Sequence, residues 1–303
     1  MVSITVFTPT FNRAHLLSQL YESLCDQTLK DFQWLIVDDG SVDNSKEVID
    51  SWIAEGVLNI RYIFQENQGM VAAHNTAHYN MTTDLCVCID SDDYMPINGI
   101  ERMLDLWKKY ASDECAGIIG LDAYSSGAIV GDKFPKTNWE CKFSELESNN
   151  ITGDKKFVHN RKIFNKFLPY PKFENEKFPI TSYLYFFIEQ EHKYLGFNEV
   201  FCIVEYQEDG LSNNIINQYK ESPNSFAHYR KARIRFAINY KLKIKNTIHY
   251  ISSMLMAKRY RIVSESPAKL LTLVLFPFGI GMYLYLKNTK RTSLNKDLNK
   301  IKN

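Results

Sequence analysis

Apolar and polar residues alternate in blocks along the first 123 residues, and the blocks predict strands and helices in turn. Short continuous apolar runs predict buried strands, and longer segments with leucines along one side predict helices. The predicted strands are residues 4–8, 32–37, 60–64, 85–89 and 117–123; the helices between them cover residues 16–24, 44–52, 70–79 and 97–110. Strands that are apolar on both faces are typical of a parallel sheet covered by helices, so we expect a doubly wound α/β fold.

The pattern changes after this region. Residues 124–221 lose the regular alternation and are rich in aromatic residues, Lys and Asn, which indicates a second lobe or a long elaboration of the same domain. Residues 226–261 contain no acid, and their basic residues interleave with apolar ones, as in a basic amphipathic helix. We therefore divide the chain into residues 1–123, 124–221 and 222–303.

Charge is unevenly distributed, although the net charge of the 303 residues is only +1. Up to Tyr110 there are 16 acidic and 7 basic residues, whereas from Ser222 onward 17 Lys and Arg face two acids. Nucleic acid is a poor explanation for the basic tail, because no aromatic platform or recognition motif accompanies it. The six cysteines lack zinc-site spacing, and a predicted strand begins at once without a leader, so we expect a reducing cytoplasm.

An acidic cluster follows the fourth predicted strand. The apolar run from Cys86 to Ile89 ends in Asp90, Asp92 and Asp93, with Ser91 between the first two. Asp90 and Asp92 can project from one face and share a divalent cation such as Mg²⁺ or Mn²⁺, which completes its shell with diphosphate oxygens. The alternative is a solvated acidic turn after a buried strand.

Three companion segments decide between these interpretations. Together with 90–93, residues 6–13, 37–43 and 66–69 resemble the inverting family 2 glycosyltransferases in residue type, order and spacing. The resemblance is strong over residues 1–123 and weaker to about residue 215. It implies a GT-A fold, which is a Rossmann-like nucleotide-sugar-binding sheet with an acceptor-side elaboration, and a UDP-linked sugar as donor.

The resemblance also implies roles for individual residues. Pro9, Thr10 and Phe11 line the uridine pocket, and Asp39 accepts the uracil imide proton. Asp92 coordinates the metal that bridges the two phosphates, Asp90 lies nearer the ribose or uridine and is the second metal residue, and Asp93 assists by hydrogen bonding. The full nucleotide-sugar set is Pro9, Thr10, Phe11, Arg13, Asp39, Asn67, Gly69, Asp90, Ser91 and Asp92. Core packing for Phe11, a turn or cap for Asp39, and an ion pair with a nearby Asp for Arg13 remain as alternatives.

An inverting enzyme needs a base that takes the proton from the attacking hydroxyl. The segment 173–178 resembles the acidic motif that supplies this base in the family, with Glu176 as the first candidate and Glu174 as the second. The segment departs from the common pattern, because Asn175 stands where Gly is frequent and no Asp follows. Both glutamates could instead be solvated loop residues. We also expect a loop over the site at residues 206–212, within which Asp209 contacts a sugar hydroxyl or forms a turn.

His74 and His78 stand one helical turn apart, a spacing that could hold a metal. No further ligands accompany them, so packing is the favoured interpretation.

The tail suggests a membrane. Residues 270–286 are apolar, somewhat shorter than the roughly 20 residues of a span, and interrupted by Pro277, Gly279 and Gly281. We expect peripheral contact through residues 226–286 at the cytoplasmic face of the bacterial inner membrane, where the acceptor is a glycan or lipid-linked glycan. The alternative is a helical hairpin packed on protein.

The leading hypothesis is a metal-dependent glycosyltransferase of cell-surface polysaccharide synthesis. The alternative is a catalytically silent nucleotide-sugar-binding or scaffold module. A dehydrogenase is excluded, because no glycine fingerprint follows the first strand.

Overall fold

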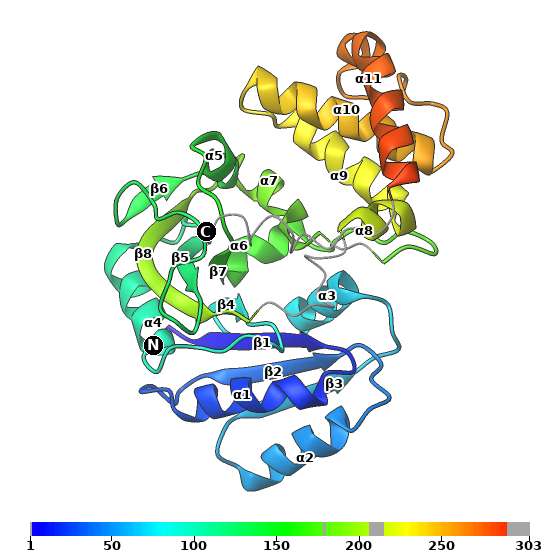
Figure 1. Cartoon of the computed structure of the whole chain (residues 1–303). Coiled ribbons are helices and arrows are strands. Elements are labelled where there is room, and N and C mark those ends of the chain that lie inside the picture. The colour runs from blue at the N-terminus through cyan, green and yellow to red at the C-terminus, as the bar shows by residue number, and fades with distance from the viewer. Residues whose placement is uncertain (1, 178–179, 206–214, 290–303) are drawn as a thin grey trace. The chain divides into compact units, whose positions relative to one another are not determined.

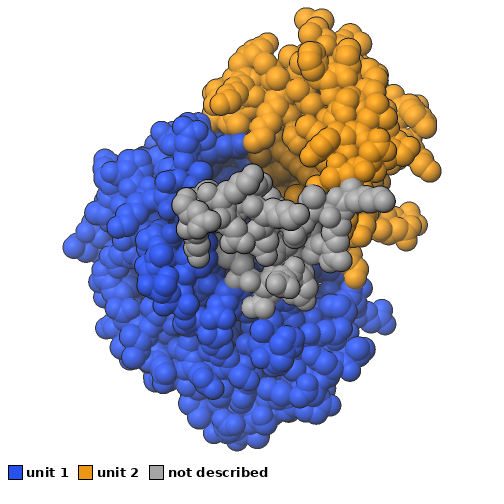
Figure 2. Space-filling view, in the orientation of Figure 1, with its two compact units in different colours: residues 1–170, 184–205 blue, residues 171–183, 206–303 orange. Residues whose placement is uncertain are grey.

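The computed structural model describes residues 2–177, 180–205 and 215–289, and the chain divides into two compact units (Figure 2). Unit 1 comprises residues 1–170 and 184–205, and unit 2 comprises residues 171–183 and 206–303. The expected loop at residues 206–212, with Asp209, lies outside the described residues.

Unit 1 is built on one mixed sheet with the strand order β3–β2–β1–β4–β7–β5–β8–β6 (Figure 1). The bounds are β1 (Ile4–Thr10), β2 (Gln33–Asp38), β3 (Ile60–Phe64), β4 (Leu85–Cys88), β5 (Gly117–Ala123), β6 (Trp139–Cys141), β7 (Lys155–Asn160) and β8 (Tyr194–Ile203). Strands β1 to β4 pair in parallel, whereas β7 is antiparallel to both β4 and β5. The expected α/β sheet is confirmed, and residues beyond 123 add three strands to it.

Helices connect the parallel strands where the periodicity predicted them. They are α1 (Ala14–Cys25), α2 (Ser45–Glu55), α3 (Met70–Asn80) and α4 (Gly99–Tyr110). The shorter helices of unit 1 are α5 (Phe143–Ser148), α6 (Arg161–Phe164), η1 (Asn165–Phe167) and α7 (Tyr185–Ile188).

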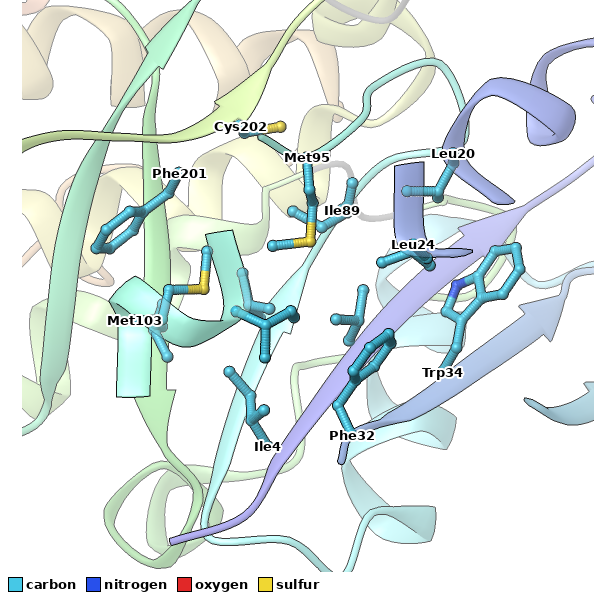
Figure 3. Packing of buried hydrophobic residues seen from close by; sticks show 14 of the residues in the cluster. Ile4, Leu20, Leu24, Phe32, Trp34, Ile89, Met95, Met103, Phe201 and Cys202 are labelled. Carbon is cyan, nitrogen blue, oxygen red and sulfur yellow. The ribbon is translucent and has the colours of Figure 1, made fainter. Parts of the chain in front are cut away.

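Both faces of the parallel part are buried, because successive side chains of a strand point to opposite faces. On β2, Trp34 and Ile36 pack in one core with side chains of α1, α2 and α4. Leu35 and Val37 pack in a second core with Ala73 and Ala77 of α3. Figure 3 shows the first core, with Trp34 beside Leu24 and with Met103 beside Phe201.

The order of the strands fixes where a ligand can bind. From β1 the chain moves to β2 and β3 on one side, and β4 then pairs with the other side of β1. In open α/β sheets, ligands bind outside the carboxyl ends of the strands at such a reversal. Residues 11–13 follow β1, residues 39–44 follow β2, residues 65–69 follow β3 and residues 89–93 follow β4, so all four motif segments lie at this edge.

Unit 2 is helical in its described part. It contains η2 (Thr181–Tyr183), α8 (Ile215–Glu221), α9 (Pro223–Arg235), α10 (Tyr240–Met256) and α11 (Lys269–Asn288). The continuous basic pattern of residues 226–261 forms two helices, because the Asn239 side chain accepts a hydrogen bond from the backbone N–H of Leu242 and starts α10. The apolar stretch 270–286 is helix α11, and Pro277 lies inside it.

Candidate functional site

Arg13 and Asp92 join the segment after β1 to the segment after β4. Nη1 of Arg13 donates to Oδ2 of Asp92 at 3.0 Å, and the two side chains are 23% and 19% exposed. Two roles were open for Arg13, a contact with the nucleotide sugar and an ion pair with a nearby aspartate. The structure shows the ion pair. Burial and the neighbouring charge of Asp90 raise the pKa of Asp92, although Arg13 opposes the shift. The acidic cluster is therefore short of positive charge even with Arg13 beside it.

A divalent cation beside Asp90 and Asp92 would supply the positive charge that the cluster lacks. A metal ion beside Asp92 would favour its charged form, as Arg13 does in part. In the described ranges, no group of three or more His, Cys, Asp and Glu side chains is arranged to hold a metal. Two carboxylates suit Mg²⁺ or Mn²⁺, which take further ligands from phosphate and water.

The carboxylate of Asp93 pairs with a buried lysine. Nζ of Lys156 on β7 lies 3.4 Å from Oδ2 of Asp93, and both residues are less than 10% exposed. Burial raises the pKa of Asp93 to about 7, although Lys156 opposes this shift. Asp122 at the end of β5 also interacts with Lys156; burial raises its pKa to about 6, and its Oδ1 has no hydrogen-bond partner among the described residues. Lys156 thus lies among acidic side chains next to the predicted metal ligands.

Sequence reasoning missed Lys156 and Asp122. The available signal was a pair of lysines at the start of a strand, of which alternation places Lys156 on the side of the apolar Val158. Because Lys155 precedes it, the sequence did not show which lysine was buried.

Asp39 organises the loop before α3. Its Oδ1 accepts hydrogen bonds from Nε2 of Gln65 at 2.7 Å and from the backbone of Gln68 at 2.9 Å. Its Oδ2 accepts from the backbone N–H of Gly69 at 2.7 Å. Gly69 has a φ of 93°, which a residue with a side chain rarely adopts. The buried carboxylate fixes the position of the predicted segment 66–69, which includes Asn67, and its contact with a uracil stays a prediction.

The segment after β1 presents an aromatic side chain. Phe11 is 44% exposed, so it is not a core residue. Asn12 holds the turn, since its backbone N–H donates to Oγ of Ser41 and its Oδ1 accepts from the backbone of Val42, both at 2.8 Å. Thr10 is buried, and its Oγ1 has no hydrogen-bond partner in the described part of the chain. Pro9 is half-buried and Ser91 is buried.

Glu176 belongs to unit 2 and caps helix α9. Its Oε1 accepts from the backbone N–H and Nδ2 of Asn224, and its Oε2 accepts from the backbone N–H and Oγ of Ser225, at 2.7–2.9 Å. A carboxylate has about four acceptor positions, so these bonds engage all of them. Glu174 is exposed. Neither glutamate shares a unit with the residues of the acidic cluster.

The two histidines of α3 are packing residues, as expected. His74 and His78 are 5% and 1% exposed, and both rings contact Phe7 edge to face. Burial lowers the pKa of His74 to about 4 and that of His78 further, so both are neutral at pH 7.

The chain matches a known protein family and several of its members. The model of the family described as Glycosyl transferase family 2 matches residues 5–181. Glycosyltransferase GlyA of Streptococcus pneumoniae is 34% identical over 135 residues, which are 43% of this chain and 19% of that protein. The match thus spans about a fifth of the length of that relative.

Solved structures share the fold. Staphylococcus aureus TarS 1–349 in complex with UDP-GlcNAc superposes with a TM-score of 0.58 at 14% identity, covering 94% of this chain and 90% of that one. The mannosyltransferase PcManGT from Pyrobaculum calidifontis, in complex with GDP-Man and Mn²⁺, gives 0.56 at 14% identity, with 93% and 87% covered.

Proposed function

Because the chain belongs to glycosyl transferase family 2, we propose that it transfers a sugar from a UDP-sugar, with inversion, to a hydroxyl of a glycan or lipid-linked glycan. The transferred group is a hexosyl or N-acetylhexosaminyl residue, and the product belongs to a cell-surface polysaccharide. The observation that supports this proposal most is that β1, β2 and β4 end side by side, with Phe11, Asp39 and the Arg13–Asp92 pair in the segments that follow them.

Each part of the donor has a proposed contact. The exposed ring of Phe11 offers a face to the base, beside Pro9 and Thr10, and the free Oγ1 of Thr10 offers a polar partner. Asp39 accepts the imide proton if the base displaces one of its loop donors. Asp92, with Asp90, holds Mn²⁺ or Mg²⁺, which when bound neutralises charge on the departing diphosphate. Arg13 would turn from Asp92 towards a phosphate.

For the general base we propose Glu176, with Glu174 as the second candidate. Glu176 must release at least one of its four hydrogen bonds before it can accept a proton, whereas the exposed Glu174 has no such requirement.

We further propose that the enzyme works at the cytoplasmic face of the bacterial inner membrane, with peripheral contact through residues 226–286. Helix α11 supports this contact: it is the one helix of the described ranges that is long and apolar enough to cross a membrane, and only 22% of its most apolar window is buried. A lipid-linked acceptor would then be presented at the surface where the enzyme docks.

The experiment is a screen of UDP-sugars with Mn²⁺ and glycan acceptors, in which UDP release is measured. We expect release with one class of donor and its enhancement by an acceptor. Binding of UDP without any release across the screen would favour the alternative, a silent nucleotide-sugar-binding or scaffold module. One observation favours this alternative: the four hydrogen bonds of Glu176 give this residue a structural role that does not require catalysis.

A further inference from the structure

Helix α11 of unit 2 has an exposed apolar face. Positions three and four apart lie on one side of a helix. Six large apolar side chains, each at least 49% exposed, follow this spacing: Leu270, Leu273, Val274, Phe278, Leu284 and Tyr285. We call these six residues the outer face of α11. A contiguous exposed face of this kind marks a contact surface rather than scattered surface residues.

The opposite face of α11 packs in the interior of unit 2. Leu275 packs in a core with Ile251 and Met254 of α10. At Gly279 the helices approach so closely that a Cβ there would lie 2.4 Å from the Ile251 side chain. Thr272 is fully buried and shares a hydrogen bond with Ser266 at 2.6 Å. The helix therefore cannot turn its outer face inwards without breaking this packing.

The part of the chain that carries the outer face is strongly basic in composition. Residues 222–289 contain twelve Lys and Arg and one acid, Glu265. That glutamate is already paired with Lys231 at 2.7 Å and with Arg259 at 3.1 Å. Lys269 and Lys287 stand at the two ends of α11, and Nζ of Lys287 lies 5.6 Å from the ring of Tyr283. Lysine and tyrosine at the ends of an apolar face suit the boundary between water and lipid.

We infer that the outer face of α11 docks in the plane of an anionic lipid surface. This inference rests on the proposed membrane contact of residues 226–286 and assigns that contact to six side chains. Anionic headgroups complement the basic composition of residues 222–289, because Lys and Arg near such a surface are attracted to it. A second copy of the chain is the poorer occupant, because it would bring two strongly basic segments together.

The packing on α10 also decides between lying in the surface and spanning the bilayer. A helix of 20 residues is about 30 Å long, enough to cross the hydrocarbon layer. However, α10 is packed against α11 and carries Lys241, Lys243 and Lys245, which a spanning α11 would bring towards the lipid core. Charged side chains there are costly, whereas an in-plane helix leaves them in water.

Flotation of the purified full chain with vesicles tests the inference. Wild-type protein should float with vesicles that contain phosphatidylglycerol and bind neutral phosphatidylcholine vesicles at least tenfold more weakly. The double variant Val274→Glu/Phe278→Glu should bind at least about a hundredfold more weakly, because each side chain contributes one to two powers of ten when buried. Gly281→Leu should strengthen binding severalfold, since Gly281 lies on the exposed side with open space around it.

Two controls separate this result from others. Val57→Glu in unit 1 places a single glutamate at another exposed apolar position and should float like wild type. Asp92→Asn should also float like wild type, so that loss of transferase activity and loss of docking are distinguished. Equal flotation of Val274→Glu/Phe278→Glu and wild type would overturn the inference. The inference would also be overturned if wild-type protein did not float and formed a dimer that these two substitutions dissociate. Resistance of the membrane-bound protein to alkaline extraction, as a spanning protein shows, would overturn it as well.

Discussion

The guanidinium of Arg13 holds the carboxylate of Asp92 at 3.0 Å, although the residues lie 79 positions apart in the chain. The bond is possible because β1 and β4 are parallel neighbours, so the segments that follow them meet at one edge of the sheet. It holds a guanidinium beside Asp92, the proposed ligand of the metal that would bind the donor's diphosphate.

The substitution Arg13→Gln should therefore raise KM for the UDP-sugar about tenfold, with a smaller change in kcat, because one charge-assisted contact to the donor is lost. Steady-state kinetics at saturating Mn²⁺ measures both constants. Arg61→Gln is the matched control, since Arg61 bonds to Asn80 instead. Unchanged KM in Arg13→Gln would show that Arg13 serves Asp92 alone.

Lys156 should stabilise the fold through Asp93. In Lys156→Met the buried carboxyls of Asp93 and Asp122 lose their cation, and loss of one partner of a buried pair costs about 3–5 kcal/mol. Urea unfolding should show most of this loss at pH 8 and less at pH 5, where the carboxyls take up protons. Lys193→Met removes an exposed pair with Glu140 and should cost at most about 1 kcal/mol. Equal losses for the two variants would refute the role of Lys156.

Asp122 should make stability depend on pH. Burial raises its pKa to about 6, so the folded state binds this proton more readily than the unfolded state does. The stabilisation of the folded state by this proton is therefore complete below the ordinary pKa of about 4, and it is lost as pH rises through about 6. A raised pKa of about two units corresponds to about 3 kcal/mol.

In Asp122→Asn, the fall in Tm between about pH 4.5 and pH 8 should consequently be several degrees smaller than in wild type. Differential scanning calorimetry across that range is the measurement. Parallel Tm profiles for the two proteins would mean that Asp122 titrates normally in the fold.

Glu176 should affect both stability and turnover. Glu176→Gln keeps one acceptor oxygen but turns an NH₂ group towards donors of α9, which should cost about 1–3 kcal/mol. As the proposed base, its loss should also lower kcat by at least about a hundredfold at unchanged donor KM. Glu174→Gln should leave stability within about 0.5 kcal/mol of wild type. If only Tm falls in Glu176→Gln while kcat holds, Glu176 is a helix cap and the base lies elsewhere.

The sequence predicted the parallel half of the fold closely, because its strands are apolar on both faces and polar turns end them. The strand expected at residues 4–8 is β1 (Ile4–Thr10), and the helix expected at 97–110 is α4 (Gly99–Tyr110). Strands β6, β7 and β8 were not predicted. They join the sheet partly as antiparallel neighbours, and their polar residues, such as Lys156, obscure the periodicity.

The site was predictable where its chemistry is local in sequence and not where it depends on distant contacts. The segments 9–13, 39–43 and 90–93 were identified because each lies at the end of a predicted strand and resembles a motif of the family. The cap that Glu176 provides joins positions 48 and 49 residues apart, and no local pattern indicates it. The same holds for the bond between Arg13 and Asp92, which depends on the strand order.

The most direct test of the donor site is the dependence of UDP release on a divalent cation and on Asp92. Wild-type protein should release UDP from its donor with Mn²⁺ or Mg²⁺ and stop in excess EDTA. Asp92→Asn should be at least about a hundredfold slower, while Asp31→Asn, at an exposed aspartate of unit 1, should match wild type. UDP release that persists in EDTA, or that is equal in Asp92→Asn and wild type, would contradict a metal-dependent donor site at Asp90 and Asp92.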